Sequence, residues 1–334
     1  MLMTWLTAQA PVAAIAEQGF RITTAAGSAT DPFIISLDWS KPQPRITRAV
    51  VIFHGIGRDV KSTYRTAVEA AASAGHAARE TVFIAPQFLD EEDLGAHSIP
   101  TDVLRWRRTE WDAGAPASAP IPVSSFDVVD AILLRLADRS VFPNLQTIVL
   151  AGHSGGAQLV HRYAVVGRAP GALSTGGLIH FRFVIANPSA YLYFSDQRPT
   201  PGGALLPFPA RGCRAFNHWK YGTLDPAAYI KLDADNTWPN MEANYAQRDV
   251  IYLLGTADTD PHGKDLDVSC GGEAQGPTRF ARGQSYYAYL HSRNGAGWNQ
   301  RMWFVPGVAH SARQMFTSTC GVSALFDVSA CPDR

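Results

Sequence analysis

Gly152-His153-Ser154-Gly155-Gly156 places a serine among small residues, directly after the apolar run TIVLA and directly before the helical pattern AQLVHRYAVV. A serine between glycines at a strand-to-helix junction lies on a tight turn that exposes its hydroxyl at a helix N-terminus. Such a hydroxyl becomes a nucleophile once a base accepts its proton. The pattern therefore predicts that Ser154 is a nucleophile in acyl transfer.

Two later segments carry the residue types that would activate this serine. Asp258 follows the apolar run VIYLL and His310 follows the run RMWFV. The hydroxyl needs a general base and the base needs an orienting acid, in the chain order Ser, Asp, His that a strand-turn-helix serine uses. We expect His310 to be the base and Asp258 the acid. Asp260 and Asp265 compete as acids and His262 as a base, but Asp258 lies nearest to its strand and His262 follows that strand too closely.

A second glycine-rich segment, His54-Gly55-Ile56-Gly57, follows the apolar run AVVIF. Glycines here let backbone N–H groups turn toward an oxyanion, and each such donor typically contributes about 3 kcal/mol to the transition state. We expect the N–H groups of Ile56 and Gly155 to form an oxyanion hole. His54 is interpreted as a structural residue that anchors the loop.

The run Arg105-Trp106-Arg107-Arg108-Thr109-Glu110-Trp111 alternates cations with aromatic side chains. Arginine binds carboxylates through paired hydrogen bonds and tryptophan offers flat apolar contact, so the run suits a groove for a carboxylated or polymeric substrate. A surface turn in which arginine stems cover tryptophan faces explains the same pattern. The substrate-binding candidates are Arg58, Trp106, Arg107, Arg108 and Trp111.

The fold class follows from alternating strand and helix patterns. Runs rich in β-branched residues occupy 49–53, 81–85, 147–151, 181–186 and 250–254, and helical patterns occupy 61–74, 126–137 and 157–166. Continuous apolar runs are typical of parallel strands that are buried on both faces. The sequence therefore predicts an α/β fold with a mostly parallel central sheet and helices on both faces. The runs 20–23 and 33–37 predict an antiparallel hairpin at the sheet edge.

Two long segments, 88–123 and 188–248, interrupt the alternation. Both follow predicted strands, and open α/β sheets bind ligands beyond the carboxyl ends of strands, so we expect these insertions to wall the active site. Aromatic residues of the second insertion are more typical of internal packing, although some should line the pocket mouth (Tyr191, Tyr193, Trp219 and Tyr221). Residues 17–334 together form one predicted catalytic domain.

The N-terminus and the cysteines bear on the compartment. Residues 1–16 are apolar and end in small residues, as a secretory signal does before a cut after Ala16, but a basic n-region is missing and a loosely packed or disordered terminus is the alternative. The cysteines are Cys213, Cys270, Cys320 and Cys331. The simplest pairing joins Cys213 to Cys270 and Cys320 to Cys331, although three connectivities exist and free buried thiols are the alternative. Disulfides would indicate a secreted or periplasmic protein.

Composition argues against several classes of partner. The chain has 29 Lys and Arg residues against 29 Asp and Glu residues, so no global field attracts nucleic acid or an anionic membrane. No segment after the N-terminus reaches the roughly twenty apolar residues that cross a bilayer. The cysteines lack a Cys-x-x-Cys spacing, and the sequence implies no metal or organic cofactor.

Four segments, VVIFHGIG, VLAGHSGGAQ, LLGTADTD and VPGVAH, resemble the catalytic blocks of the α/β-hydrolase superfamily over about residues 48–316. The resemblance implies the fold and a Ser-His-Asp triad, and leaves the substrate open. NPSAYLYF, HWKYG and SCGGEAQGPTRFARG are similar to secreted hydrolases grouped with polyhydroxybutyrate depolymerases and poly(aspartic acid) hydrolases. The expected function is hydrolysis of an ester or amide, with a polymeric, anionic substrate as one hypothesis. A small-molecule carboxylesterase or lipase and a non-catalytic binding protein of the same fold are the alternatives.

Overall fold

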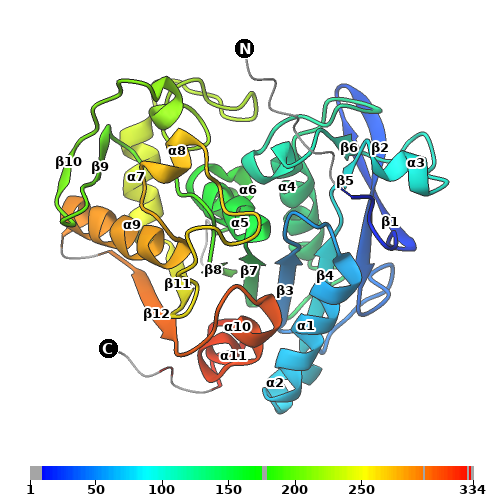
Figure 1. The fold of residues 1–334 in the computed structure, drawn as a ribbon. Coiled ribbons are helices and arrows are strands. Elements are labelled where there is room, and N and C mark those ends of the chain that lie inside the picture. Colours follow the sequence, from blue (N-terminus) through cyan, green and yellow to red (C-terminus); the bar gives the residue numbers. More distant parts are fainter. Residues whose placement is uncertain (1–9, 175–178, 296–297, 329–330, 332–334) are drawn as a thin grey trace.

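A computed structural model describes residues 10–174, 179–295, 298–328 and 331 (Figure 1). Its centre is an eight-stranded sheet in the spatial order β1-β2-β4-β3-β7-β8-β11-β12. The strands are β1 (Gln18–Thr24), β2 (Gly27–Ile35), β3 (Arg48–Phe53), β4 (Thr81–Pro86), β7 (Thr147–His153), β8 (His180–Ala186), β11 (Asp249–Gly255) and β12 (Gln300–Val305). The β1–β2 and β2–β4 pairs are antiparallel and the other pairs are parallel. The predicted mostly parallel sheet with a hairpin at its edge is confirmed.

Helices cover both faces of the sheet, which explains why the central strands are apolar throughout. Along β3, Ala49, Val51 and Phe53 belong to the core on one face, and Val50 and Ile52 to the core on the other. The first face carries α4 (Ser125–Leu136), α5 (Gly155–Val166), α6 (Arg168–Ser174), α7 (Trp238–Gln247) and α9 (Arg279–Asn294). The second carries α1 (Val60–Ala72), α10 (Ala312–Thr317) and α11 (Thr319–Phe326), which lie together in Figure 1.

The ends of the predicted helices are set by local caps. Asp59 accepts a hydrogen bond from the N–H of Ser62 at the start of α1. Ser124 and Asp127 form a reciprocal capping box at the start of α4. These caps begin both helices one residue before the predicted starts, because the capping residues precede the apolar pattern from which the helices were predicted.

The two insertions contain short elements. The first holds β5 (Leu89–Asp90), α3 (Asp93–Ala96), β6 (Arg105–Trp106) and the 3-10 helix η1 (Glu110–Ala113). The second holds β9 (Gln197–Pro199), β10 (Leu205–Pro207), the 3-10 helix η2 (Arg214–Asn217) and α7. Two further short helices are α2 (His76–Arg79) and α8 (Cys270–Glu273). The insertions are therefore ordered largely by loop contacts rather than by long regular elements.

The N-terminal segment lies against the first insertion. Residues 1–9 of the predicted signal-like or disordered segment fall outside the described residues. Within 10–16, the N–H of Val12 donates to Asp93 Oδ1 and the N–H of Ala16 donates to Gln87 Oε1, both at 2.8 Å. Among the described residues, no helix has the length and apolar character that a membrane span requires.

The parallel strands bring the predicted site residues to one edge of the sheet. β3, β7, β11 and β12 all run in the same direction, so the residues that follow them share the carboxyl edge. These following segments contain Ile56, Ser154, Asp258 and His310. Residues that are up to 254 positions apart are thus positioned by the sheet itself, and this edge is where an open α/β sheet binds its ligands.

Candidate active site

Ser154 lies in the turn between β7 and α5, with φ 57° and ψ −119°. A positive φ is uncommon for a residue other than glycine and is held only where the surroundings determine it. A Cβ added to Gly152 would overlap the backbone of Gly156, and a Cβ added to Gly156 would overlap the carbonyl oxygen of Phe53. Neighbouring backbone approaches these two positions so closely that only glycine fits. This is the physical reason for glycine at both ends of the segment from Gly152 to Gly156.

The predicted oxyanion segment lies directly against this turn. A Cβ added to Gly155 would lie 2.7 Å from Ile56 Cγ2 and 3.1 Å from the backbone nitrogen of Ile56. Gly155 is the first residue of α5, so its N–H is among the groups that have no acceptor within the helix. The backbone nitrogens of Ile56 and Gly155 thus lie close together beside Ser154, as two donors to one oxyanion must.

His54 is a buried, neutral residue that fixes the oxyanion segment. Its Nδ1 donates to the carbonyl of Gly55 at 2.8 Å, and its Nε2 accepts from the N–H of Phe88 at 2.9 Å. Burial lowers the pKa of His54 to about 4, in keeping with a ring nitrogen that must remain an acceptor. His54 joins the segment to the start of the first insertion, which is the structural role expected for it.

His310 and Asp258 form a direct hydrogen bond, with His310 Nδ1 2.7 Å from Asp258 Oδ2. An ionised carboxylate only accepts hydrogen bonds, so Nδ1 donates and Nε2 is left as an acceptor. Asp258 is buried, and its Oδ1 lies 3.7 Å from Nη1 of the buried Arg279. The ring of His310 lies 4.3 Å from that of His153, the residue before Ser154. The pair therefore lies beside the serine turn.

The competing acids and the competing base lie farther along the same loop. Asp260, Asp265 and His262 are exposed. Asp260 Oδ1 accepts a hydrogen bond from the N–H of His262 at 2.8 Å, so it caps a local turn. Asp265 lines a cavity next to Ile56. In the structure it is Asp258 that contacts His310.

Arg58 borders a hollow next to Ile56, but its side chain is buried and is not presented to a substrate as the sequence interpretation expects. Its side chain is 1% exposed, and its guanidinium donates to both carboxylate oxygens of Asp93, at 3.1 and 3.0 Å. It also donates to the carbonyl of Ala10 at 3.0 Å and to that of Ile56 at 3.2 Å. The prediction that Arg58 binds substrate is wrong because a buried acidic partner, 35 residues later in the chain, takes up its charge.

Trp106 and Trp111 are likewise fully buried, which contradicts their prediction as substrate contacts. The ring of Trp111 lies 4.6 Å from that of His54 and is stacked at 5.3 Å on Phe88. Trp106 contacts Phe88 edge-on at 5.1 Å, so both tryptophans pack against Phe88. Burial removes their large apolar rings from water. Arg107 and Arg108 are exposed, and their role in binding stays a prediction.

A cavity of about 200 Å³ lies next to the oxyanion segment. Apart from Ile56 it is lined by polar residues, and the lining comes from six separate segments of the chain: Ile56, Thr109, Asp112, Gln158, Ser189, Lys220, Tyr221, Asp265 and Asp267. Gln158 belongs to the first turn of α5, where its N–H donates to the Ser154 carbonyl at 3.1 Å. Sequence reasoning missed most of these residues because they are isolated polar positions in loops. Of the aromatic residues expected at the pocket mouth, Tyr221 lines this cavity, and Ile56 and Asp265 were named in other roles.

Two more hollows adjoin this cavity. One of about 360 Å³ shares Thr109, Asp112, Lys220 and Tyr221 with it and is otherwise lined mainly by apolar groups, Trp219 among them. The other, of about 400 Å³, shares Ile56 and Asp265. The three hollows therefore follow one another past the oxyanion segment. Among the described residues, no group of three or more His, Cys, Asp or Glu side chains is arranged to hold a metal ion.

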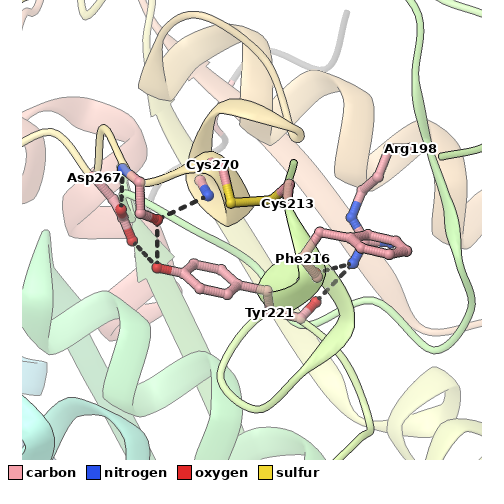
Figure 2. Close-up of a disulfide and its surroundings, with 8 residues drawn as sticks. Arg198, Cys213, Phe216, Tyr221, Asp267 and Cys270 are labelled. Carbon is pink, nitrogen blue, oxygen red and sulfur yellow. Dashed lines mark hydrogen bonds between the residues drawn. A yellow bond between two sulfur atoms is a disulfide. The ribbon is translucent and has the colours of Figure 1, made fainter. Parts of the chain in front are cut away.

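Two disulfides are present, Cys213–Cys270 and Cys320–Cys331, and these are the pairings that the spacing favours. The first joins the second insertion to the loop that follows β11. Figure 2 shows it beside Tyr221, whose hydroxyl donates to Asp267 Oδ2 at 2.6 Å. Covalent and hydrogen-bonded links thus join the two segments that line the cavity on this side.

Two solved structures share the architecture of this chain. The poly(3-hydroxybutyrate) depolymerase LpqC from Bordetella parapertussis matches over 95% of this chain and 91% of its own, with 22% identity and a TM-score of 0.61. Poly(aspartic acid) hydrolase-1 from Sphingomonas sp. KT-1 matches over 92% of this chain and 96% of its own, with 20% identity and a TM-score of 0.58. No protein-family model and no curated protein matches the sequence. The expected α/β-hydrolase fold is confirmed.

Proposed function

We propose that this protein is a serine hydrolase that cleaves ester or amide bonds through an acyl-enzyme, with Ser154, His310 and Asp258 as its triad. One observation carries the proposal. The hydrogen-bonded pair of His310 and Asp258 lies beside a serine that is held at φ 57° between strand and helix. A strained serine turn next to an oriented histidine is an arrangement that acyl transfer requires.

In this proposal the serine attacks a carbonyl carbon and forms the acyl-enzyme. His310 Nε2 accepts the proton of Ser154 Oγ and then donates it to the leaving group. The Asp258 carboxylate keeps the Nδ1 proton in place and stabilises the imidazolium that forms. The N–H groups of Ile56 and Gly155 donate to the oxyanion. Water, activated by the same histidine, then hydrolyses the acyl-enzyme.

A non-catalytic binding protein of the same fold is the alternative. The φ of 57° at Ser154 is a conformation that costs of order 1–3 kcal/mol for a residue other than glycine. Asp258 is buried, its charge is compensated by Arg279, and it accepts a hydrogen bond from His310. A binding protein has no need for a strained serine or a buried acid at this edge of the sheet. These features favour the enzyme.

The shape of the site favours a chain-like substrate. The three adjoining hollows, together with walls from both insertions, support an extended binding groove rather than a closed pocket. The names of LpqC and of poly(aspartic acid) hydrolase-1 refer to polymers, which is compatible with such a groove. We therefore propose a polyester or polyamide hydrolase, and the two disulfides support a secreted or periplasmic enzyme.

The test uses a panel of p-nitrophenyl esters, polyhydroxybutyrate and poly(aspartic acid), together with a fluorophosphonate that labels activated serines. We expect labelling at Ser154, hydrolysis of short esters, and release of oligomers from one of the polymers. Labelling without polymer cleavage would favour a small-molecule carboxylesterase. No labelling and no turnover would favour the binding protein.

A further inference from the structure

Lys220 lies in the wall of the cavity beside the oxyanion segment, and no catalytic step proposed above uses it. Its side chain is 26% exposed. It lines both the 200 Å³ cavity and the adjoining 360 Å³ hollow, so it stands where the two meet. A charged side chain at this position lies in the wall of a cavity that a substrate bound at Ile56 would adjoin.

The backbone around Lys220 is held in a tight turn. The N–H of Trp219 donates to the carbonyl of Leu224 at 2.6 Å, and the N–H of Tyr221 donates to the carbonyl of His218 at 2.8 Å. Indole Nε1 of Trp219 donates to the carbonyl of Ala113 at 2.7 Å, which links the turn to the first insertion. The turn therefore offers Lys220 from a fixed position.

Two buried arginines donate hydrogen bonds to backbone carbonyls of the same turn. Arg198 Nη2 donates to the carbonyls of Phe216, at 2.7 Å, and Tyr221, at 3.2 Å (Figure 2). Arg162 Nε donates to the carbonyl of Lys220 at 3.4 Å. Because the backbone is fixed before any ligand arrives, only side-chain conformational entropy is lost when the ammonium makes a new hydrogen bond.

The ammonium of Lys220 has donors to spare. Among the described residues it makes one ion pair, with Asp267 Oδ2 at 3.6 Å. That carboxylate already accepts from the Tyr221 hydroxyl at 2.6 Å and from the N–H of Ser269 at 3.0 Å. Burial opposes the charge, but Asp112 and Asp267 together raise the pKa of Lys220. A lysine ammonium carries three donors, so one ion pair leaves donors from which a ligand oxygen can accept.

The charged side chains that line this cavity favour an uncharged acceptor oxygen over a carboxylate. Asp112, Asp265 and Asp267 line the cavity with Lys220. Arg162 compensates Asp112 at 2.9 Å, so among the residues that line the cavity two carboxylates, Asp265 and Asp267, face one ammonium. A substrate carboxylate would meet repulsion from both, whereas an uncharged oxygen would meet only the donor.

We infer that Lys220 is a specificity-determining residue, which donates a hydrogen bond to an uncharged acceptor oxygen on the acyl part of the substrate. The next carbonyl of a polyester or polyamide chain is such an oxygen. The inference rests on the proposed function and deepens it, since it assigns the acyl group to the cavity beside Ile56.

The test compares two p-nitrophenyl esters that differ by one oxygen. The 4-oxopentanoate has a carbonyl where the pentanoate has a methylene, and the hemisuccinate supplies a carboxylate. For the native enzyme we expect kcat/KM to be about tenfold or more higher for the 4-oxopentanoate than for either other ester, as a hydrogen bond to a charged donor allows. In Lys220→Met this preference should disappear, with pentanoate hydrolysis within about threefold of native. Lys61→Met, at an exposed lysine of α1 that lines none of the three hollows, is the matched control and should keep the preference.

Binding separates this inference from the hydrolase proposal. Calorimetry with 4-oxopentanamide and pentanamide needs no turnover, and we expect the ketone to bind about tenfold more tightly to the native protein and equally with pentanamide to Lys220→Met. An equal loss for all ligands in Lys220→Met would assign Lys220 a structural role and overturn the inference. A native preference for the hemisuccinate would overturn it as well.

If Lys220→Met does not fold, Lys220→Arg should retain the preference for the ketone, and loss of that preference would also count against the inference. Absence of all ester hydrolysis, with the binding preference intact, would contradict the hydrolase and leave the Lys220 contact standing.

Discussion

The two sides of the candidate site are built from different interactions. On the side of the serine turn, Gly152, Gly155 and Gly156 allow backbone to approach backbone, and the donors for an oxyanion are main-chain N–H groups. On the side of the cavity wall, charged side chains and a disulfide join segments that are distant in the chain. The serine side is rigid because backbone packs directly against backbone, with no space for a side chain at Gly152 or Gly156. The second is rigid because buried charges need their partners.

This difference separates chemistry from selectivity. The backbone on the serine side is suited to the features that all acyl substrates share, the carbonyl carbon and its oxygen. The wall side carries Lys220, Asp265 and Asp267, whose charges are suited to distinguish one acyl group from another. We therefore expect loss of the Ser154 hydroxyl to alter turnover without changing stability, and changes on the wall side to alter stability or selectivity.

The largest effect is expected for Ser154→Ala, which should lower kcat/KM at least about a thousandfold. The melting temperature should stay close to that of the native protein, because a single oxygen is lost from the turn. Steady-state kinetics on a p-nitrophenyl ester and a thermal melt measure both. Retention of more than a few per cent of activity would remove Ser154 from the proposed mechanism.

Arg162→Met should lower the free energy of unfolding by about 3–5 kcal/mol, because it leaves the buried Asp112 carboxylate without its partner. Urea unfolding of the native and variant proteins measures the change. The control is Arg313→Met, whose exposed ion pair with Glu69 should contribute below about 1 kcal/mol. Adding Asp112→Asn to Arg162→Met should restore part of the loss. Equal effects of Arg162→Met and Arg313→Met would contradict the account of the wall.

Removal of either disulfide should lower the free energy of unfolding, but only removal of the Cys213–Cys270 bridge, which supports the cavity wall, should change KM. In the chain-entropy description, the bridge over 57 residues contributes about 4 kcal/mol and the bridge over 11 residues about 3 kcal/mol. The double substitution Cys213→Ser with Cys270→Ser should also raise KM, since it releases the segments that carry Lys220 and Asp267. Cys320→Ser with Cys331→Ser should leave KM unchanged. Four thiols that alkylate in the native, unreduced protein would refute both bridges.

The smallest effect is expected for the exposed arginines of the first insertion. The double variant Arg107→Gln with Arg108→Gln should lower kcat/KM for an anionic polymer about two- to fivefold at low ionic strength, and this difference should vanish at high salt because exposed charges are screened. A neutral ester is the internal control and should not respond. If the double variant and the native enzyme behave alike at low salt, these arginines are solvated surface, and the cavity wall alone selects the substrate.

The difference between the serine side and the cavity wall also explains which parts of the site could be predicted from the sequence. The serine turn, the strands and helices α1, α4 and α5 depend on neighbouring residues, on glycine spacing or on apolar periodicity, which are legible in one sequence. The pairs Arg58–Asp93 and Arg162–Asp112 join residues that are 35 and 50 positions apart, and nothing local marks them as partners. An arginine with a buried partner cannot be distinguished in sequence from an arginine on the surface. For this reason Arg58 was assigned wrongly and the role of Asp112 was missed.

The tryptophans illustrate a further limit. Trp106 and Trp111 lie within an arginine-rich run, and the pattern alone favours exposure of the whole run. In the structure the backbone turns between them, and Arg108 has a φ of 51°. Both indole rings therefore enter the core while the arginines between them stay in solvent. One positive-φ residue changes which side chains face outward, and the sequence does not mark that residue.

The row of adjoining hollows has a consequence for product length. A groove with parts of about 200, 360 and 400 Å³ beside the oxyanion segment has room for several monomer units, whereas a single pocket holds one. Each unit that occupies a further hollow adds contacts, so kcat/KM should rise with oligomer length until the row is filled and then level off. Cleavage should fall inside chains, and early digests of a polymer should contain oligomers rather than monomer. Chromatography of a time course on oligomers of defined length would measure both the plateau and the products, and monomer released from the first minutes would place the cut at chain ends instead.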